Sequence, residues 1–309
     1  MKTKKTIKSF LLFMCLGLFV LYGNYTSFSS LLITPSAREN ALAGTGVANA
    51  QGPQAMYFNP ALTGGLEKTV VSFSYNNWFL DMYQQSLFVV KPLPRLNLGL
   101  GITNFNQGEI ELRTNQPTES EIGQFSPADF SFYLNLSRKL NEDVLLGISG
   151  RYYYEKILDY TATGYGLDVG LLFKASPKFN FGFSVINFGS TMYFIRDEFW
   201  LPTRFLTGIN YVFNLRPNIK TVFVSDLSYF VYDKRIEFNS GIETQIAQQY
   251  FIRSGYNFTN LIHRQNQDIP NSFSFGFGTI VKKIRLEYAF TPYRSGLDDV
   301  HHFSIGFGY

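Results

Sequence analysis

The stretch His301–Tyr309, which reads HHFSIGFGY, decides the fold. Large apolar residues take every second position in it, namely Phe303, Ile305, Phe307 and Tyr309. Serine and glycine fill the positions between them from residue 304 onward. A period of two is that of a β-strand, and this contrast in size is typical of a strand with lipid on one side and a crowded lumen on the other. The nonapeptide alone leaves a second interpretation open, the final strand of a soluble β-domain.

Residues 1–30 have the order of a secretory signal peptide. Four lysines precede an apolar run over residues 10–22, and small and polar residues follow as far as Ser30. We expect cleavage between about residue 23 and residue 30. The single cysteine, Cys15, lies in this segment. The exported chain is therefore expected to have neither disulfides nor thiolate chemistry.

The composition agrees with an exported membrane protein made of strands. Hydrophobic residues make up 45%, aromatic residues 17% and charged residues 16%, with a mean hydropathy of −0.04. Apolar and polar residues are thus finely mixed, and no run after residue 30 could span a bilayer as a helix. The net charge of +4 comes from the four lysines of the signal segment. The remainder is close to neutral, which argues against nucleic acid as a partner.

From residue 68 onward, alternating segments recur with turn residues between them. We predict fourteen strands, at 69–79, 82–91, 95–105, 128–139, 143–156, 163–175, 178–188, 202–213, 218–230, 236–246, 249–258, 271–281, 284–292 and 300–309. Single-chain bacterial barrels have even strand counts. The sequence therefore predicts an all-β fold, a transmembrane outer-membrane β-barrel of about 14 antiparallel strands over residues 68–309.

The predicted connections alternate in length. Every second one is tight, such as Lys91–Arg95 and Ser176–Lys178, and these are expected to be periplasmic turns. The longer ones, notably 106–127, 189–201 and 259–270, are expected to face outward, where loops carry function. Our candidate contacts for a protein partner lie there because exposed aromatics beside charges are typical of contact sites: Phe194, Arg196, Phe199 and Trp200.

Alternation also assigns each strand residue to a face. In 284–290, Ile284 and Leu286 fall on the lipid side, whereas Arg285 and Glu287 fall on the lumen side. The same rule gives the lumen a set of charged residues of both signs: Arg151, Glu155, Asp168, Arg204, Glu237, Glu243, Arg253, Arg285 and Glu287. Such a wall suits a network of ion pairs, among its own residues or with an internal plug. A polar substrate path is the alternative, which we favour less because the two signs are interspersed.

Residues 31–67 precede the first strand and read as a plug segment rather than as a strand. Gly44 and Gly46 permit dihedrals or close contacts that a side chain would block. Pro60 restricts Asn59 to an extended backbone, and the Asn59 side chain could bond backbone groups inside the lumen. We expect this segment to fold into or under the periplasmic end of the barrel.

This segment resembles the N-terminal signature of the PorV/PorQ family. The matching positions are the apolar Leu31–Ile33 with Pro35, then Ala37 and Arg38, Gly44, Gly46–Ala48, and the aromatic-Asn-Pro-Ala element formed by Phe58, Asn59, Pro60 and Ala61. The chain departs from the family pattern at Ala43 and Leu62. The terminal aromatic, Tyr309, is similar to the C-terminal signal by which outer-membrane proteins are recognised for insertion.

The resemblance implies a fourteen-stranded, FadL-like barrel in the cell outer membrane, surrounded by outer-membrane lipid. It implies that the protein is a non-enzymatic partner in type IX protein secretion and surface attachment. Its own partners would be secretion-system proteins or secreted cargo domains. The alternative that the wider resemblance offers is a FadL-like channel for hydrophobic compounds. The charged inner face argues modestly against this alternative.

Catalytic and metal-binding patterns are sparse in the sequence. The three histidines include the adjacent pair His301 and His302, but neighbouring strand residues point to opposite faces, so a shared metal would need a bulge. No nucleophile and base can be paired from the sequence. We therefore expect no catalytic residue, no metal and no cofactor.

Overall fold

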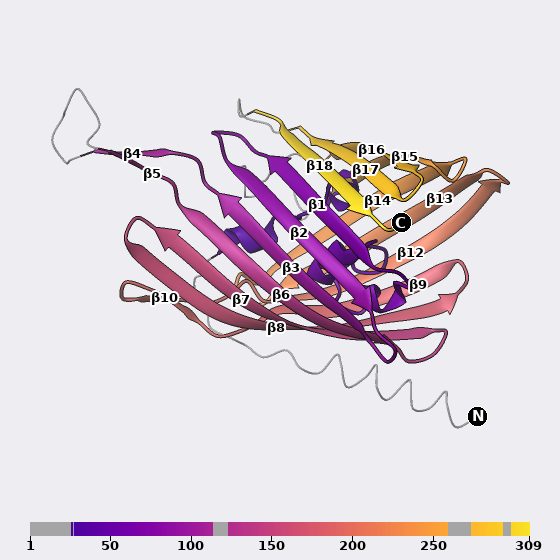
Figure 1. Cartoon of the computed structure of the whole chain (residues 1–309), viewed down its shortest axis with the longest axis horizontal. Coiled ribbons are helices and arrows are strands. Elements are labelled where there is room, and N and C mark those ends of the chain that lie inside the picture. Colours follow the sequence, from indigo (N-terminus) through magenta and orange to yellow (C-terminus); the bar gives the residue numbers. More distant parts are fainter. Residues whose placement is uncertain (1–25, 27, 114–122, 259–272, 293–297) are drawn as a thin grey trace.

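The computed structural model describes residues 26, 28–113, 123–258, 273–292 and 298–309. The predicted signal peptide lies almost entirely outside the described residues, and the predicted loop 259–270 lies wholly outside them. Fourteen antiparallel strands close into one barrel (Figure 1). They are β1 (Val70–Asn77), β2 (Tyr83–Pro92), β3 (Asn97–Asn106), β6 (Ala128–Lys139), β7 (Val144–Ile157), β8 (Tyr160–Ser176), β9 (Phe179–Gly189), β12 (Arg204–Arg216), β13 (Ile219–Phe230), β14 (Arg235–Ile246), β15 (Tyr250–Asn257), β16 (Phe273–Val281), β17 (Ile284–Thr291) and β18 (Val300–Phe307). The predicted barrel of fourteen strands is confirmed.

Each predicted strand corresponds to one strand of the barrel, with ends that differ by up to three residues. The largest differences are at β8, which begins at Tyr160 rather than at residue 163, and at β12, which ends at Arg216 rather than at residue 213. Two short hairpins lie where the sequence predicted only loops. They are β4 (Ile110–Leu112) with β5 (Gly123–Phe125), and β10 (Met192–Phe194) with β11 (Asp197–Phe199). Each hairpin is a two-stranded sheet of its own, separate from the barrel.

The barrel closes between its first and last strands. In β1, Ser74 lies opposite Ser304 of β18, and the two hydroxyl oxygens are 2.8 Å apart. Closure pairs the edge strands, which removes exposed backbone donors and acceptors from the bilayer. We call the end with the tight connections 93–96, 140–143, 177–178, 217–218, 247–249 and 282–283 the short-turn end, and the opposite end the long-loop end.

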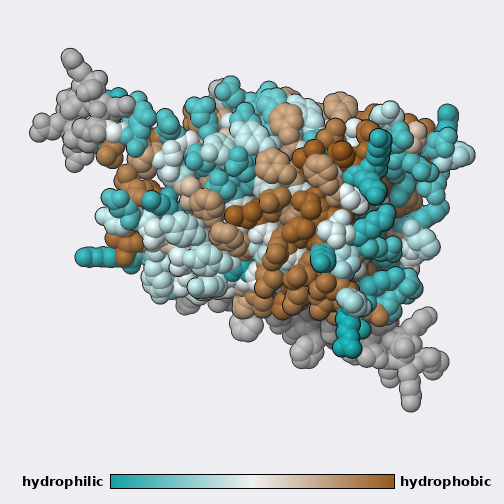
Figure 2. Space-filling model, viewed as in Figure 1, coloured by the Kyte–Doolittle hydropathy of each residue, from teal (hydrophilic) through white to brown (hydrophobic). Residues whose placement is uncertain are grey.

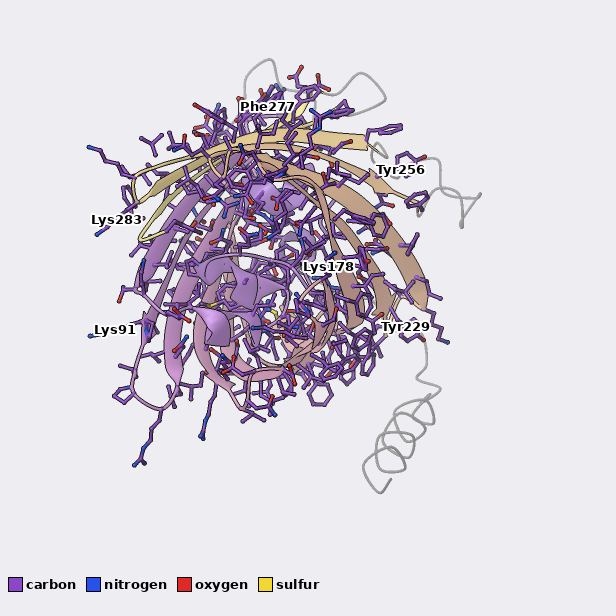
Figure 3. All side chains as sticks on the ribbon, turned by 90° about the vertical axis from the view of Figure 1, so that its right-hand side faces the viewer. Lys91, Lys178, Tyr229, Tyr256, Phe277 and Lys283 are labelled. Carbon is purple, nitrogen blue, oxygen red and sulfur yellow. The ribbon has the colours of Figure 1, made fainter. Side chains whose placement is uncertain are left out.

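The outer face is apolar and the inner face polar, as the alternation predicts. In β16, the side chains of Phe273, Phe275 and Phe277 are about half exposed, whereas Ser274 between them is buried. Figure 2 shows apolar residues gathered over the middle of the visible face, with hydrophilic residues at the short-turn end. In Figure 3, which looks from that end, Phe277 points outward from the wall, and Lys91 and Lys283 lie at the rim. This distribution suits a bilayer-spanning barrel.

The chain end departs from the predicted alternation. Strand β18 ends at Phe307, and Gly308 then turns the chain with a φ of +99°. The ring of Tyr309 consequently lies against Gly306 and Gly52, with the guanidinium of Arg285 5.3 Å from its centroid. Tyr309 therefore points inward and does not share the lipid face with Phe303 and Phe307.

An N-terminal stretch, residues 28–66, lies inside the barrel, and we call it the luminal segment. It contains three 3-10 helices and one short α-helix: η1 (Ser29–Leu32), α2 (Ala37–Ala41), η2 (Pro53–Tyr57) and η3 (Leu62–Gly65). Phe28 packs against Tyr153 near the long-loop end, and Gly64 contacts the backbone of Arg138 near the short-turn end. The segment thus runs the length of the lumen, further than the periplasmic position expected from the sequence. No helix in the described part of the chain is long and apolar enough to cross a membrane.

Candidate functional site

The luminal segment is held to the barrel wall by a buried chain of ion pairs that begins at Arg38. Ser36 caps the short helix α2, and Arg38 follows two residues later. The Arg38 guanidinium contacts both carboxylate oxygens of Glu243 in β14, with N···O distances of 2.9 and 3.0 Å. It also donates to Glu39 at 2.8 Å and to the carbonyl of Asn49 at 3.0 Å. One side chain therefore ties α2, the following loop and the wall together.

The chain of charges continues along the wall with alternating sign. Glu243 accepts a third hydrogen bond, from Arg253 in β15, at 2.6 Å. Arg253 also pairs with Glu287 in β17 at 3.1 Å, and Glu287 pairs with Arg285. Pairing of this kind is what keeps buried charges tolerable. The predicted ion network is confirmed for these residues.

A second group of charges lies on the opposite wall. Arg151 in β7 pairs with Asp168 in β8, and both side chains are buried. Arg151 also donates to Asn187 at 2.9 Å and to the backbone carbonyl of Tyr57 at 3.2 Å. The segment is thus bonded to the wall on two sides. Burial raises the pKa of Tyr57 to about 12, so its hydroxyl remains a donor to the carbonyl of Leu31, 2.7 Å away.

Gly44 and Gly46 allow the luminal segment to turn against the wall. Gly44 has a φ of +78°, which favours glycine, and the ring of Phe58 occupies the place of a side chain at Gly46. The turn presents the N–H groups of Gly46 and Val47 to one carboxylate oxygen of Asp226 in β13, at 2.6 and 3.0 Å. Asp226 was not among the residues predicted to face the lumen, although the alternation of β13 places it inward.

The Asn59–Pro60–Ala61 element fits between the segment and two strands. The Asn59 amide donates to the carbonyls of Val47 at 2.8 Å and Leu171 at 3.0 Å, and its oxygen accepts from Ala61 N at 3.0 Å. The expected bonding of Asn59 to backbone groups inside the lumen is therefore confirmed. Gly147 in β7 leaves room for the backbone of Pro60, because a side chain there would overlap it.

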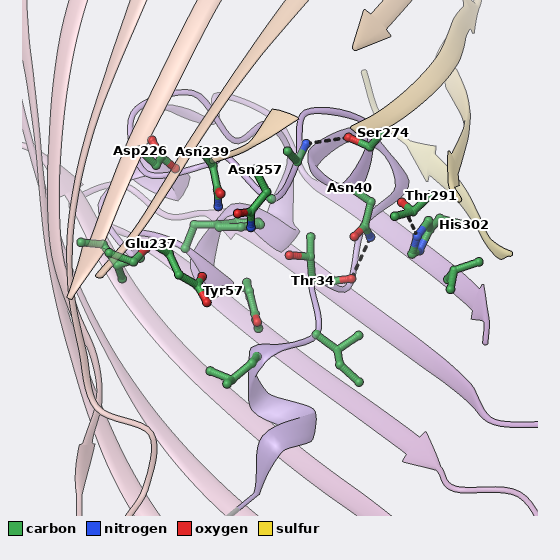
Figure 4. A pocket seen from close by; sticks show the side chains of 18 of the residues that line it. Thr34, Asn40, Tyr57, Asp226, Glu237, Asn239, Asn257, Ser274, Thr291 and His302 are labelled. Atoms are coloured by element: carbon green, nitrogen blue, oxygen red, sulfur yellow. Dashed lines mark hydrogen bonds between the residues drawn. The ribbon is translucent and has the colours of Figure 1, made fainter. Parts of the chain in front are cut away.

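A cavity of about 300 Å³ lies between the luminal segment and the long-loop half of the wall (Figure 4). Leu32, Ile33, Ile186 and Leu206 give it apolar surface. The polar side of its lining comes largely from strands β12–β18: Arg204, Asp226, Ser228, Glu237, Asn239, Asn257, Ser274, Thr291 and His302. A mixed lining with a few convergent polar groups is typical of a small-molecule site. This cavity is the candidate functional site.

The two adjacent histidines lie on opposite faces, as expected from the strand. His302 is buried and lines the cavity, whereas Nδ1 of His301 is 2.8 Å from the hydroxyl of Tyr288 on the other face. Within the described ranges, no three residues among His, Cys, Asp and Glu gather as metal ligands.

The predicted partner contacts lie on or next to the β10–β11 hairpin. Phe194 packs 6.1 Å from the ring of Tyr160, Trp200 stacks on Tyr232 at 4.8 Å, and Phe199 lies opposite Met192. Arg196 is exposed. Beside it, the apolar residues Tyr193 and Ile195 are 60% and 63% exposed, and the sequence analysis did not name them.

No protein-family model matches the sequence, and no curated protein matches it. Solved structures of channels are similar to the chain. The toluene transporter TodX of Pseudomonas putida aligns with a TM-score of 0.64 at 13% identity, covering 88% of this chain and 96% of TodX. The monoaromatic hydrocarbon channel CymD aligns with a TM-score of 0.61 at 13% identity, covering 90% of this chain and 98% of CymD. A FadL homologue of Pseudomonas aeruginosa aligns with a TM-score of 0.54 at 11% identity, covering 92% of this chain and 99% of the homologue.

The shared feature is the fold. This chain and these channels have the same barrel fold over almost the whole length of each channel.

Proposed function

We propose that the protein is an outer-membrane channel for small hydrophobic compounds, in which the luminal segment acts as the plug. The observation that carries the proposal is the cavity of about 300 Å³ on the long-loop side of that segment. It offers apolar surface inside a barrel that shares its fold with hydrocarbon channels. This reverses the order of the two functions that the sequence suggested.

The charges on the inner face argued against an apolar substrate, but most of them pair with the luminal segment or with one another. Arg38 and Glu243, Arg253 and Glu287, and Arg151 and Asp168 pair in buried positions. These charges therefore hold the plug in place, and the apolar residues of the cavity are available to contact a ligand. A compound would enter at the long-loop end and pass the plug when the ion pairs between the plug and the wall break.

The test is uptake by bacteria whose outer membrane contains the protein. A radiolabelled alkylbenzene such as toluene should enter such cells several times faster than cells with an empty vector, while a sugar of similar mass should enter at the same rate in both. Surface levels of the protein are matched by quantitative blotting of outer-membrane fractions. Equal toluene uptake with and without the protein would refute the channel.

A second candidate, a PorV/PorQ-like partner in type IX secretion, is favoured by the N-terminal signature and by the apolar side chains on the β10–β11 hairpin. Tyr193 and Ile195 flank the half-buried Phe194 and precede Arg196 on a hairpin beyond the barrel. Transient partners are commonly met by aromatic and arginine side chains on rigid loops.

Pull-down from cells that possess a type IX system distinguishes the two functions. Under this candidate, the variant Phe199→Ala/Trp200→Ala and the variant Ile195→Ser/Arg196→Ser should each lose secretion proteins or cargo domains that the parent protein captures. The hairpin β4–β5 offers the control Ile110→Ser. Capture that is unchanged in both double variants would exclude this candidate.

A further inference from the structure

Three polar residues form one row across neighbouring strands and face the cavity. Asp226 in β13 lies opposite Asn239 in β14, and Asn239 lies opposite Asn257 in β15. Figure 4 shows the three side chains next to one another at the cavity. On the other side of Asp226, β12 carries Gly208, where a side chain would overlap the carboxylate. The Asp226 carboxylate therefore occupies space on the inner wall that a side chain at residue 208 would fill.

This row presents hydrogen-bond acceptors that the described part of the chain does not use. The oxygen Oδ2 of Asp226 accepts from Gly46 and Val47, but its Oδ1 has no hydrogen-bond partner among the described residues. The amide oxygen of Asn239 is likewise buried and has no partner there. A buried acceptor without a donor destabilises a protein, so such atoms call for an explanation. Two neighbouring ones at one cavity indicate a site for a donor.

The rest of the cavity lining determines what kind of molecule can carry the hydrogen-bond donor. Leu32, Ile33, Ile186 and Leu206 are apolar and suit a hydrocarbon body. An apolar cavity of about 150 Å³ is already large enough for benzene. The cavity of about 300 Å³ therefore has room for a substituted ring.

We infer that the cavity binds a compact apolar molecule that carries a hydrogen-bond donor, such as a hydroxyl- or amino-substituted aromatic compound, in preference to the plain hydrocarbon. The inference rests on the proposed channel function and narrows its substrate class. A hydroxyl would donate its one hydrogen bond to Oδ1 of Asn239, an amino group would have a further proton for Oδ1 of Asp226, and the ring would contact the apolar residues.

The chain contains its own reporter for this test. It has two tryptophans, and Trp78 lines the cavity whereas Trp200 does not. In a Trp200→Phe background, reconstituted in lipid nanodiscs, the fluorescence of Trp78 is titrated with ethylbenzene, 2-phenylethanol and 2-phenylethylamine, which share one skeleton. Empty nanodiscs correct for partition into lipid. One extra satisfied hydrogen bond predicts a Kd about tenfold lower for the alcohol or the amine than for ethylbenzene.

A matched pair of variants links the preference to the row. Asn239→Leu removes an acceptor and keeps the bulk, so the preference should disappear while ethylbenzene binding stays within about twofold. Asn210→Leu is the control, because Asn210 lies inside the barrel on β12 but does not line this cavity. Asp226→Asn retains an acceptor for Gly46 and Val47, and it should weaken the amine alone if the bound donor is cationic.

Three results would overturn the inference: equal affinities for the three compounds, a preference that survives Asn239→Leu, or no saturable change in Trp78 fluorescence. Each leaves the channel standing if toluene uptake by cells is still raised. Absence of uptake together with a clear alcohol preference would instead refute the channel and retain a binding site.

Discussion

Arg38 of α2 and Glu243 of β14 are 205 residues apart in the chain, yet the guanidinium of one contacts both carboxylate oxygens of the other. Both side chains are almost completely buried, and Glu243 is shared with Arg253. The plug is therefore attached to the wall by an interaction that solvent scarcely screens.

Arg38→Met should loosen the plug without preventing barrel formation. Glu243 keeps its bond to Arg253, so the wall retains a paired charge, but the segment loses four hydrogen bonds. Loss of one partner of a buried ion pair costs about 3 to 5 kcal/mol. We expect ion conductance in planar bilayers to rise severalfold. Arg113→Met, which removes an exposed pair with Glu111, is the control, and equal conductance in both variants would contradict the prediction.

Gly147→Ala should displace the Asn59–Pro60–Ala61 element. A methyl group at residue 147 would overlap the Pro60 carbonyl, whereas nothing lies within 4 Å of one at Gly150 on the same strand. Overpacking costs about 1 to 3 kcal/mol, and the strand itself tolerates alanine. The thermal unfolding midpoint in detergent should fall for Gly147→Ala and remain unchanged for Gly150→Ala. Similar midpoints for the two variants would argue against this contact.

Asn59→Asp should destabilise the plug although it changes hardly any volume. The amide donates to the carbonyls of Val47 and Leu171, and a carboxylate would face both oxygens without a proton. The expected cost is at least about 2 kcal/mol. Asn141→Asp is the matched control, because Asn141 only accepts hydrogen bonds from Asp143 N and Val144 N, which a carboxylate does equally well. Chymotryptic cleavage after Tyr57 or Phe58 measures plug exposure, and resistance equal to that of the control would be evidence against the role of Asn59.

A disulfide between η3 and β6 should reduce uptake if the plug has to move. The hydroxyls of Thr63 and Ser137 are 2.7 Å apart, so cysteines at both positions are close enough to bond. Ser225 and Ser240, 2.9 Å apart on neighbouring wall strands, give a control disulfide that does not involve the plug. Toluene uptake should fall on oxidation of the first pair alone and recover on reduction. Uptake that is insensitive to the first disulfide would show that compounds pass without movement of η3.

The sequence was sufficient for the barrel because most of its strands alternate. Residues such as Phe275 and Ser274 differ so strongly in polarity that only one face can meet lipid. The inward charges Arg151, Glu243 and Arg253 could be placed for the same reason. Alternation fails at Tyr309, since the positive φ of Gly308 turns the chain out of the strand.

The contacts of the luminal segment could be predicted only in part. Asn59 was expected to bond backbone groups, because a buried amide needs partners. Its particular partners, and the pairing of Arg38 with Glu243, depend on how the segment lies in the barrel, and no local pattern encodes that. The row of Asp226, Asn239 and Asn257 spans three strands, and it becomes visible only when their register is known.

The long path from α2 to β14 also has a consequence for assembly. Contacts between distant parts of a chain form slowly, because the intervening loop has to be closed first. Arg38 lies near the N-terminus of the chain, whereas Glu243, Arg253 and Glu287 belong to strands that follow much later in the sequence. Arg38 can therefore meet its partner in the wall only after β14 has formed. Sealing of the lumen consequently comes late in assembly, and until then Arg38 lacks its two bonds to Glu243.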